Sequence, residues 1–565
     1  MESPSIPQDK ATARLYEAGT GGNGKVLHGA SPATRSGEVS TTGLHDEALG
    51  VRDPGTPDMP AWLRDVQKHI QTHGEGMVEL NGTTLGEESP SQASMDAALS
   101  SLRDAMQAVG AEARVLRSRP ATRDSRASTD VWVRCRPGEG EVLEVHVAVI
   151  GNVDSGKSTL VGVLTHAALD DGRGSARARV FTHGHEQSTG RTSSIGQHSI
   201  CLDASGTFLN DAQYRPSTAS DYVARAAKII TLVDLAGHTK YFKTTASGLT
   251  GHLPDYAAVV IGANAGVIGM CKEHLGVALA LQIPTFFVVT KVDLAPAHVA
   301  KHSLETLTTI LKHPSIRKKP FMIRSMDDVI TCAKHLHTSN LAPIFVTSCV
   351  SGAGLDLIRT FLDLLPQRHQ WSTKRAEGAQ FMINEVFGVP GVGTVVSGTV
   401  RSGVIVPGSV LALGPDVSDG TFKPCAVKSV HFKRLPVDHV VAGQTASLAL
   451  KKVKRSGVRR GMILADPGLH CSAGWEFEAE IAVLTHSTTI QTRYQAVIHC
   501  EAVRQSAQVV GMDRDRLRSG DRATVRFRFL QHPEYLTPGA RFVFREGKTK
   551  GVGRVVGFAD EKRKA

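Results

Sequence analysis

One segment constrains the fold of this chain more than any other. Residues 151–158 read Gly-Asn-Val-Asp-Ser-Gly-Lys-Ser and match the pattern G-x-x-x-x-G-K-[ST]. They follow the apolar run Val145–Ile150 and open a predicted helix, Lys157–Leu169, which is the setting in which this loop binds phosphate. Its backbone N–H groups and the helix dipole attract phosphate oxygens. The segment predicts a nucleotide-binding α/β domain in which Lys157 reaches the β- and γ-phosphates and Ser158 ligates Mg²⁺.

A second motif places groups around the γ-phosphate. Asp234-Leu-Ala-Gly237 ends the predicted strand Ile229–Val233, where Asp234 can hold Mg²⁺ through water and the Gly237 N–H can contact the γ-phosphate. His238 follows and can orient the attacking water, so Lys157 and His238 are the expected catalytic residues. The residues expected to bind the phosphates are Gly151, Asn152, Val153, Asp154, Ser155, Gly156, Lys157, Ser158, Thr159 and Gly237.

A third motif predicts that the base is guanine. Thr290-Lys-Val-Asp293 ends the predicted strand Phe286–Val289, and a carboxylate at Asp293 can accept two N–H groups that guanine has and adenine lacks. The motif usually begins with Asn, so Thr290 predicts somewhat looser binding of guanine without loss of specificity. The expected guanine-binding residues are Thr290, Lys291 and Asp293 with Ser348, Cys349 and Val350 from a third strand end.

The order of apolar runs predicts the domains. Strands alternate with helices over residues 141–370, which predicts a doubly wound, mostly parallel sheet. Short strands punctuated by Gly and Pro then predict two β-barrel domains, 379–470 and 471–560. Residues 61–140 suggest a small α/β region with a helix over 95–109, and residues 1–60, rich in Gly, Pro, Ser and Thr, are predicted to be disordered.

Composition limits the partners and the compartment. The net charge is +11, and ten basic residues lie in 423–461 with one acid, Asp438. Such a stretch is either a solvated surface or a phosphate-backbone site. The apolar runs are too short to span a membrane, no secretory signal starts the chain, and the eight Cys form no C-x-x-C pair, which favours a reducing compartment. The basic residues are Lys423, Lys428, Lys433, Arg434, Lys451, Lys452, Lys454, Arg455, Arg459 and Arg460.

Several motifs resemble the translational GTPases related to elongation factor Tu. The matching segments are GNVDSGKST at 151–159, DLAGH at 234–238, Pro390–Gly398 and Gly443-Gln444 in the first predicted barrel, and Arg541–Gly547 in the second. A closer resemblance is to the GTP-binding protein 1 and 2 family, over roughly residues 94–557. It is carried by Gly190–Gly196, Lys243–Thr245, Thr250–Pro254, Thr347–Leu355, Pro390–Thr399, Gly443–Gly461 and Trp475–Glu480.

The resemblance implies a cytoplasmic, monomeric GTPase that binds aminoacyl-tRNA with GTP and acts at the ribosomal A site. It also implies links to ribosome quality control, exosome-dependent mRNA decay and ribosome-rescue factors, but no DNA partner, and it makes the basic stretch an RNA-facing surface. By the same resemblance Ser194, in the polar segment 172–199, is the switch residue that ligates Mg²⁺, Asp154 can help hold a monovalent cation, and Ser193 with Val153 forms a half-polar gate before His238.

Three other functions remain open from the sequence. The chain could be mainly a GTP-dependent scaffold that recruits decay or rescue proteins, with hydrolysis only for release. It could be the regulatory GTPase subunit of a sulfate-activating enzyme, although its barrel motifs match elsewhere. It could be an inactive GTPase, but the residues that this alternative would lack are all present: Lys157, Ser158, Asp234, His238, Lys291 and Asp293.

Overall fold

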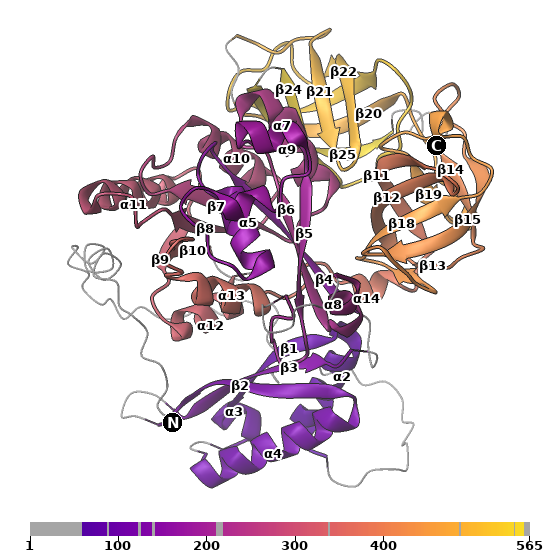
Figure 1. Ribbon diagram of the computed structural model, residues 1–565. Helices are drawn as coiled ribbons and strands as arrows, with labels where there is room; N and C mark the ends of the chain where they lie inside the picture. Colours follow the sequence, from indigo (N-terminus) through magenta and orange to yellow (C-terminus); the bar gives the residue numbers. More distant parts are fainter. Residues whose placement is uncertain are drawn as a thin grey trace.

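The computed structural model describes residues 59–87, 90–121, 126–137, 142–210, 219–336, 340–484, 488–546 and 548–558. Residues 1–58 of the extension that is predicted to be disordered lie outside the described residues. Gly547, at the end of one of the motifs above, also lies outside them. Figure 1 shows an N-terminal α/β region, a central domain built on a large sheet, and two barrels beside it. The predicted fold class is confirmed. None of the described helices is long and apolar enough to cross a membrane.

The central domain has a seven-stranded sheet in the order β5-β6-β4-β7-β8-β10-β9. Neighbouring strands are parallel except β5, which runs antiparallel to β6 at one edge. The strands are β4 (Leu143–Gly151), β5 (Gly196–Leu202), β6 (Lys228–Asp234), β7 (Tyr256–Gly262), β8 (Thr285–Thr290), β9 (Lys319–Met322) and β10 (Leu341–Val346). The helices are α5 (Lys157–His166), α6 (Ser175–Ala178), α7 (Gly184–Thr189), α8 (Ala219–Arg225), the 3₁₀ turn η2 (Thr239–Tyr241), α9 (Phe242–Gly251), α10 (Gly269–Ala280), α11 (Ala297–Lys312), α12 (Met326–His335), α13 (Leu355–Asp363) and α14 (Trp371–Lys374).

Strand β4 lies between two apolar cores. Val145, Val147 and Val149 join the core that includes α5, α12 and α13, whereas Ala148 and Ile150 join the core that includes α9, α10 and α11. Alternate side chains of a strand point to opposite faces, so an unbroken apolar strand needs helices on both sides. This double burial holds the end of β4 in place, and the motif at 151–158 starts there.

Helix α5 is shorter than expected. It ends at His166, three residues before Leu169, because Ala167 takes a left-handed conformation with φ of 49°. The chain then turns, and the Asp170 N–H donates to the carbonyl of Cys349 at 2.9 Å. The turn directs the polar segment 172–199 toward the phosphate-binding loop.

The N-terminal region is an antiparallel sheet, in the order β1-β3-β2, that shares an apolar core with two helices. The predicted helix over 95–109 lies within α4 apart from Val109, and its buried positions, Met95, Ala98, Leu102, Ala105 and Met106, follow helical spacing. The elements are α2 (Ala61–His73), β1 (Glu75–Asn81), α3 (Gly82–Leu85), α4 (Gln92–Ala108), β2 (Ala111–Arg119) and β3 (Ser128–Cys135).

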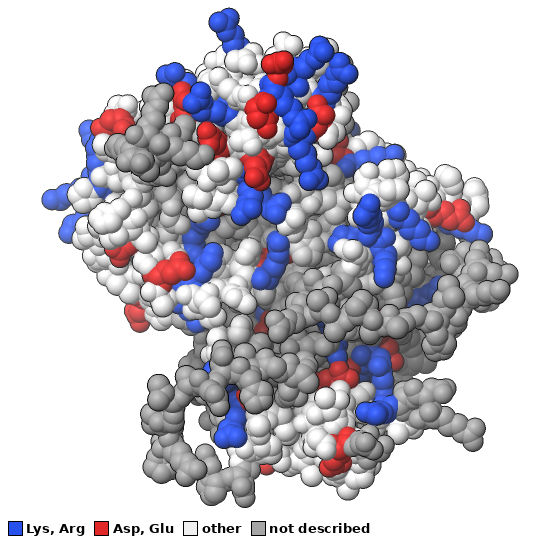
Figure 2. All heavy atoms as spheres, turned by 180° about the vertical axis from the view of Figure 1, so that it is seen from behind, with Lys and Arg blue, Asp and Glu red and all other residues white. Residues whose placement is uncertain are grey.

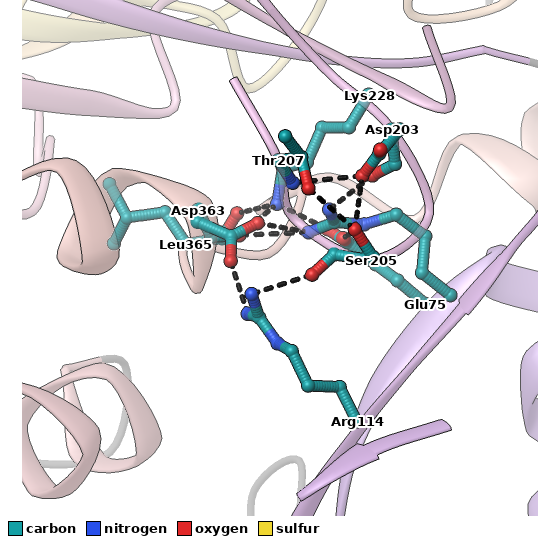
Figure 3. Close-up of polar contacts among 9 residues, drawn as sticks. Glu75, Arg114, Asp203, Ser205, Thr207, Lys228, Asp363 and Leu365 are labelled. Atoms are coloured by element: carbon teal, nitrogen blue, oxygen red, sulfur yellow. Dashed lines mark hydrogen bonds and ion pairs between the residues drawn. The ribbon is translucent and has the colours of Figure 1, made fainter. Parts of the chain in front are cut away.

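Buried charges join the N-terminal region to the central domain (Figure 3). Arg134 of β3 is fully buried and donates to Glu75 of β1 at 2.9 Å and to Asp363 of α13 at 2.8 Å. Lys228, the first residue of β6, donates to the same Glu75 at 2.7 Å and to the backbone oxygens of Asp363 and Leu365. Both cations also lie over the Trp132 ring, which holds them by cation–π attraction.

A third cation completes this network. Arg114 of β2 pairs with Asp363 and donates to the Ser205 carbonyl at 2.6 Å, in the turn that follows β5. Burial lowers the pKa of Lys228 to about 8. Burial opposes ionisation of Asp363 as well, but Arg134, Arg114 and Lys228 outweigh it and hold its pKa below the usual value. Every charge in the network has a partner, which is the condition for burying it.

The rest of the chain forms two closed barrels. The first has the cyclic order β11-β12-β18-β15-β14-β19, and the second has β20-β23-β22-β21-β24-β25. Within the described residues each of the six strands of either barrel pairs with a neighbour on both sides. The first contains β11 (Gln380–Val389), β12 (Gly393–Ser402), β14 (Val410–Gly414), β15 (Lys423–Phe432), β18 (Thr445–Leu450) and β19 (Ile463–Ala465), with short β13 (Val404–Ile405), β16 (Leu435–Pro436) and β17 (Val440–Val441). The second contains β20 (Glu476–Val483), β21 (Gln495–Cys500), β22 (Val503–Met512), β23 (Arg522–Phe529), β24 (Arg541–Glu546) and β25 (Lys548–Phe558).

The basic residues of the stretch 423–461 fall into two groups in the structure, one that joins domains and one that is exposed. Lys433 pairs with buried Glu144 of β4 at 2.5 Å, and Arg459 pairs with Glu534 of the second barrel at 2.8 Å. Arg460 donates to Ala502 at 3.2 Å and toward Ser247 of α9 at 3.4 Å. These three residues hold domains together. The exposed members are Lys423, which pairs with Asp416, and Lys428, Arg434, Lys451, Lys452, Lys454 and Arg455.

Arg134→Met should destabilise the junction between the N-terminal region and the central domain. The change leaves Glu75 and Asp363 buried with fewer cations, and breaking a buried pair in this way costs about 3–5 kcal/mol. We expect a clear fall in the thermal unfolding midpoint. The matched control is Arg136→Met, which removes the same charge at an exposed site and should leave the midpoint unchanged. Equal midpoints for the two variants would contradict the role of the network.

Candidate nucleotide-binding site

The loop after β4 requires glycine at both ends. Gly151 has φ of 146°, and a Cβ there would lie 2.2 Å from the carbonyl oxygen of Val260 on β7. Gly156 has φ of 87° and caps α5, and a Cβ there would lie 3.2 Å from Thr290 Oγ1. L-residues with side chains disfavour positive φ, so these two positions explain the glycines of the motif. Asp154, between them, is exposed and left-handed.

A buried histidine supports the loop from behind. The Gly151 N–H donates to Nδ1 of His274 on α10 at 3.3 Å, so the histidine is neutral and carries its proton on Nε2. Burial lowers the pKa of His274 to about 3 and keeps it neutral. Its ring stacks on Phe242, the first residue of α9, at 5.5 Å, and Arg545 of the second barrel lies over Phe242 at 4.7 Å. Sequence reasoning missed His274, which no motif marks.

Lys157 and Gly237 lie in contact. The Lys157 Nζ is buried and donates to the Asn152 carbonyl at 2.6 Å, and burial lowers the pKa of this amine while Asp234 opposes the shift. A Cβ on Gly237 would lie 2.5 Å from Nζ and 2.8 Å from the Asn152 oxygen. Only glycine allows the D-x-x-G segment to pack this closely on the phosphate-binding loop.

Three oxygens meet where the sequence predicts Mg²⁺. Ser158 Oγ donates to Asp234 Oδ2 at 2.6 Å, and Thr192 Oγ1 lies 2.7 Å from Ser158 Oγ and 3.4 Å from the same carboxylate oxygen. Asp234 is buried, and its other oxygen, Oδ1, has no hydrogen-bond partner in the described part of the chain. Burial raises the pKa of Asp234, and a divalent cation would reverse that shift. Hydroxyl and carboxylate oxygens beside a phosphate site fit Mg²⁺.

Ser194 does not lie with Ser158 and Asp234 in this structure. Its N–H and hydroxyl both donate to Glu186 Oε1, at 3.0 and 2.9 Å. Ser193 donates to the same oxygen at 2.7 and 2.8 Å, and its hydroxyl also lies 2.7 Å from His185 Nε2. The resemblance placed Ser194 at the metal and Ser193 beside Val153; in this structure the hydroxyl that lies beside Ser158 and Asp234 is that of Thr192, which the sequence analysis did not name.

Glu186 therefore organises the polar segment. The carboxylate is buried and accepts six hydrogen bonds, since the Thr182 and His183 N–H groups donate to its second oxygen. Burial opposes ionisation, but the bonds from Ser193 and Ser194 outweigh it and lower the pKa of Glu186 to about 2. No motif in the sequence marks Glu186. Its only sign is that it is the one acidic residue in the polar segment 172–199, which is rich in Ser and Thr.

One pocket collects the phosphate-side residues. His238 reaches it from the turn before α9, half-buried, with Nδ1 accepting the Lys240 N–H at 3.1 Å. Gly151, Asn152 and Ser155 belong to the loop but not to the wall of the pocket. The wall is formed by Val153, Asp154, Gly156, Lys157, Ser158, Thr159, Arg177, Gly190, Arg191, Thr192, Gly237 and His238.

The guanine-side residues lie at the same edge of the sheet but outside that pocket. Thr290, at the end of β8, is buried and donates its hydroxyl to the Ser155 carbonyl at 2.6 Å, so it ties β8 to the phosphate-binding loop. Asp293 is exposed. Ser348 Oγ accepts the N–H groups of Val350 and Ser351 and shapes the turn after β10.

Cys349 lies in the same turn and is buried. Burial raises the pKa of its thiol to about 12, and the negative charges of Asp170 and Asp293 add to this shift. The thiol therefore stays neutral beside Asp293, the carboxylate that is expected to meet guanine. Because the thiol carries no charge, it does not compete with Asp293 for the base, and the turn can offer its backbone groups.

Two family models match the chain. The Elongation factor Tu GTP binding domain matches residues 144–367, and Elongation factor Tu domain 2 matches residues 393–465. GTP-binding protein 1 of Xenopus laevis is 51% identical over 428 residues, which cover 75% of this chain and 65% of that protein. GTP-binding protein 2 of Mus musculus is 43% identical over 486 residues, which cover 85% of this chain and 80% of that protein. The chain thus spans a little under two thirds of the length of the former relative.

Solved structures support the fold. Elongation factor SelB of Methanococcus maripaludis, in complex with the GTP analogue GppNHp, superimposes with a TM-score of 0.54 at 18% identity and covers 74% of this chain and 80% of its own. A bacterial selenocysteine-specific elongation factor gives a TM-score of 0.53 at 18% identity, over 73% of this chain and 58% of its own. At this identity the likeness concerns the fold alone.

Glu186→Gln should loosen residues 182–194. A glutamine amide offers one acceptor oxygen and replaces the other with a donor, so it cannot accept all six bonds. Hydrogen exchange of the amides of His183, Ser193 and Ser194 should accelerate by roughly 10-fold or more, the size expected for lost bonds to a charged group. Glu305→Gln, on the exposed side of α11, is the control. Unchanged exchange in Glu186→Gln would contradict the assigned role.

Proposed function

The chain belongs to the GTP-binding protein 1 and 2 family of translational GTPases, and from this premise we propose that it binds aminoacyl-tRNA in its GTP form and hydrolyses GTP at the ribosomal A site. The observation that carries the GTP-binding part of the proposal is the shared pocket. The phosphate-binding loop, the Gly237-His238 segment and the Thr192 loop all line it, so one bound γ-phosphate would contact all three.

The proposed chemistry relies on position and charge. Phosphoryl transfer needs alignment and charge neutralisation more than covalent catalysis by the protein. Lys157 would move from the Asn152 carbonyl to the β- and γ-phosphates, and His238 would orient the attacking water. Ser158, Asp234 and either Thr192 or Ser194 would hold Mg²⁺, which neutralises phosphate charge when bound.

Guanine recognition is proposed at the ends of β8 and β10. Asp293 would accept the two guanine N–H groups, Lys291 would cover the base, and the turn Ser348–Val350 would contact guanine O6 through its backbone. Thr290 Oγ1 already bonds the Ser155 carbonyl at 2.6 Å, which links the base side of the site to the phosphate side. An asparagine at this position could donate to the Ser155 carbonyl and make one further hydrogen bond through its amide. Because Thr290 lacks that amide, we expect looser binding of guanine.

The finer parts of the proposal concern partners and place. We propose that the protein is a cytoplasmic monomer that acts in elongation, ribosome quality control or mRNA surveillance. We also propose that it contacts exosome or ribosome-rescue factors and that a monovalent cation binds near Asp154. The two barrels, matched in part by Elongation factor Tu domain 2, support RNA delivery over a purely recruiting scaffold.

The structure narrows the RNA-facing surface that we propose. Figure 2 shows the molecule from behind, and on that face Lys and Arg are spread out with acids among them, not gathered into one patch. Lys433, Arg459 and Arg460 hold domains together, and of the seven exposed basic residues that remain, four lie close in sequence in the loop after β18: Lys451, Lys452, Lys454 and Arg455. Arg455 packs beside the β11–β12 hairpin, since a Cβ on Gly388 would lie 3.3 Å from Arg455 Cδ.

Asp293→Asn tests the base specificity. It exchanges an acceptor for a group with a donor, so GTP affinity should fall by roughly 10²-fold or more while affinity for xanthosine triphosphate, which has an oxygen in place of the 2-amino group, should rise. Equilibrium binding of fluorescent nucleotides measures both. Asp515→Asn, exposed in the second barrel, should behave as the parent protein. A parent protein that binds ATP as well as GTP would overturn the proposed function.

Filter binding with charged and uncharged tRNA tests the RNA partner. The parent protein with GTP should prefer charged tRNA, and with GDP it should bind weakly. The Lys451→Ala/Lys452→Ala double variant should bind charged tRNA less tightly, with the salt slope of log K reduced by about 2, because each lost phosphate contact removes about 1. The control Lys301→Ala/Lys312→Ala removes two exposed charges from α11. Equal losses in both double variants would contradict a specific surface.

A further inference from the structure

We propose that Arg177 binds the γ-phosphate and neutralises the charge that gathers there during hydrolysis, as an arginine supplied by the chain itself. The inference rests on the proposed GTP site and adds a residue that no motif of the sequence marks. Arg177 belongs to α6, in the polar segment between α5 and β5, and it lines the same pocket as Lys157 and His238.

The turn that carries Arg177 is firmly anchored. Asp170 Oδ1 accepts the Ala176 N–H at 2.9 Å, and Asp171 Oδ1 accepts the Arg173 and Ser175 N–H groups. Ala176 is buried against α5, where a Cβ on Gly162 would lie 2.2 Å from the Ala176 carbonyl oxygen. The backbone of α6 is thus held on the first helix of the nucleotide site, which limits where the Arg177 side chain can reach.

Two glycines make room for the guanidinium. A Cβ on Gly174 would lie 2.4 Å from Arg177 Nε, and one on Gly190 would lie 3.4 Å from Nη2. Both glycines have positive φ, 96° and 66°. Gly190 ends α7 just before Thr192, the residue at the metal position, so the guanidinium is next to the loop that the nucleotide is expected to order.

The charge of Arg177 is not used elsewhere in the described residues. Arg114, Arg134 and Arg459 each pair with a carboxylate within 4 Å, whereas no carboxylate in the parts of the chain that the structure describes lies that close to Arg177. Arg191 also lines the pocket but is exposed, while Arg177 is half-buried. A half-buried guanidinium that lines the pocket together with Lys157, and that has no acid within 4 Å in the described residues, is available to an anion, and the anion expected in this pocket is the triphosphate.

The chemistry asks for such a group. During phosphoryl transfer negative charge spreads over the oxygens of the transferred group, and an arginine there contributes strongly in related GTPases, whether it comes from the same chain or from a partner. The guanidinium fork can donate to two phosphate oxygens at once, and its charge is permanent. Lys157 would serve the β–γ side from the loop, and Arg177 would reach the same pocket from α6.

The test compares di- and triphosphate binding. Affinities of the full chain for fluorescent GDP and for fluorescent GppNHp, with Mg²⁺, are measured for the parent protein and for Arg177→Ala. We expect GppNHp affinity to fall by roughly 10- to 100-fold, the size of a lost bond between charged groups, with GDP affinity near the parent value. Arg177→Lys should restore part of the loss, because lysine keeps the charge without the fork. Single-turnover GTP hydrolysis should fall in the same order.

Arg179→Ala is the matched control, since Arg179 is exposed on the same turn and does not line the pocket. It should bind both nucleotides as the parent does. Unchanged GppNHp affinity in Arg177→Ala, or an equal loss for GDP and GppNHp, overturns the inference while the proposed function stands. A parent protein that binds neither nucleotide overturns the proposed function instead.

Discussion

The hydrogen bond from Ser158 Oγ to Asp234 Oδ2 joins the two motifs on which the candidate site depends. Ser158 opens the helix after β4, and Asp234 ends the neighbouring strand β6, so the contact follows from parallel strands that bring their carboxyl ends to one edge. On the other side Thr290, at the end of β8, bonds the Ser155 carbonyl. The phosphate-binding loop is thereby fixed from two strands, and its glycines stay in conformations that other residues disfavour.

Buried carboxylates join the other domains to this sheet and to one another. Glu75 binds Arg134 and Lys228, Glu144 binds Lys433, and Glu534 binds Arg459 across the two barrels. Lys228 begins β6 and Glu144 lies near the start of β4, so both strands that end in the nucleotide site are fixed at their other ends by neighbouring domains. Because separating a buried charge from its partner costs several kcal/mol, roughly 3–5 for one pair, these junctions oppose independent movement of the domains.

The polar segment shows where sequence reasoning stops. The resemblance placed a switch residue, Ser194, in the polar segment 172–199, and the structure places another residue of that segment, Thr192, beside Ser158. It also turns Ser194 to Glu186, because this one buried carboxylate accepts the N–H and hydroxyl groups of both Ser193 and Ser194. Such contacts depend on which groups meet in space, and several hydroxyls of similar chemistry follow each other in this stretch. The same limit applies to the basic stretch, where spacing could not separate Lys433, which bonds Glu144, from Lys451, which is exposed.

By itself the sequence determined the fold class, the order of domains and the identity of the phosphate-binding loop. The fold class and the order of domains follow from the periodic pattern of apolar residues. The phosphate-binding loop follows from glycines at positions where a tight turn needs a backbone conformation that other residues disfavour. Both signals are properties of short segments. The tertiary structure alone decided which side chains meet: Thr192 beside Ser158, His274 behind Gly151, and Arg177 in the pocket that Lys157 also lines. Those residues come from separate elements, and their meeting is set by the packing of helices and loops on the sheet, which no local pattern encodes.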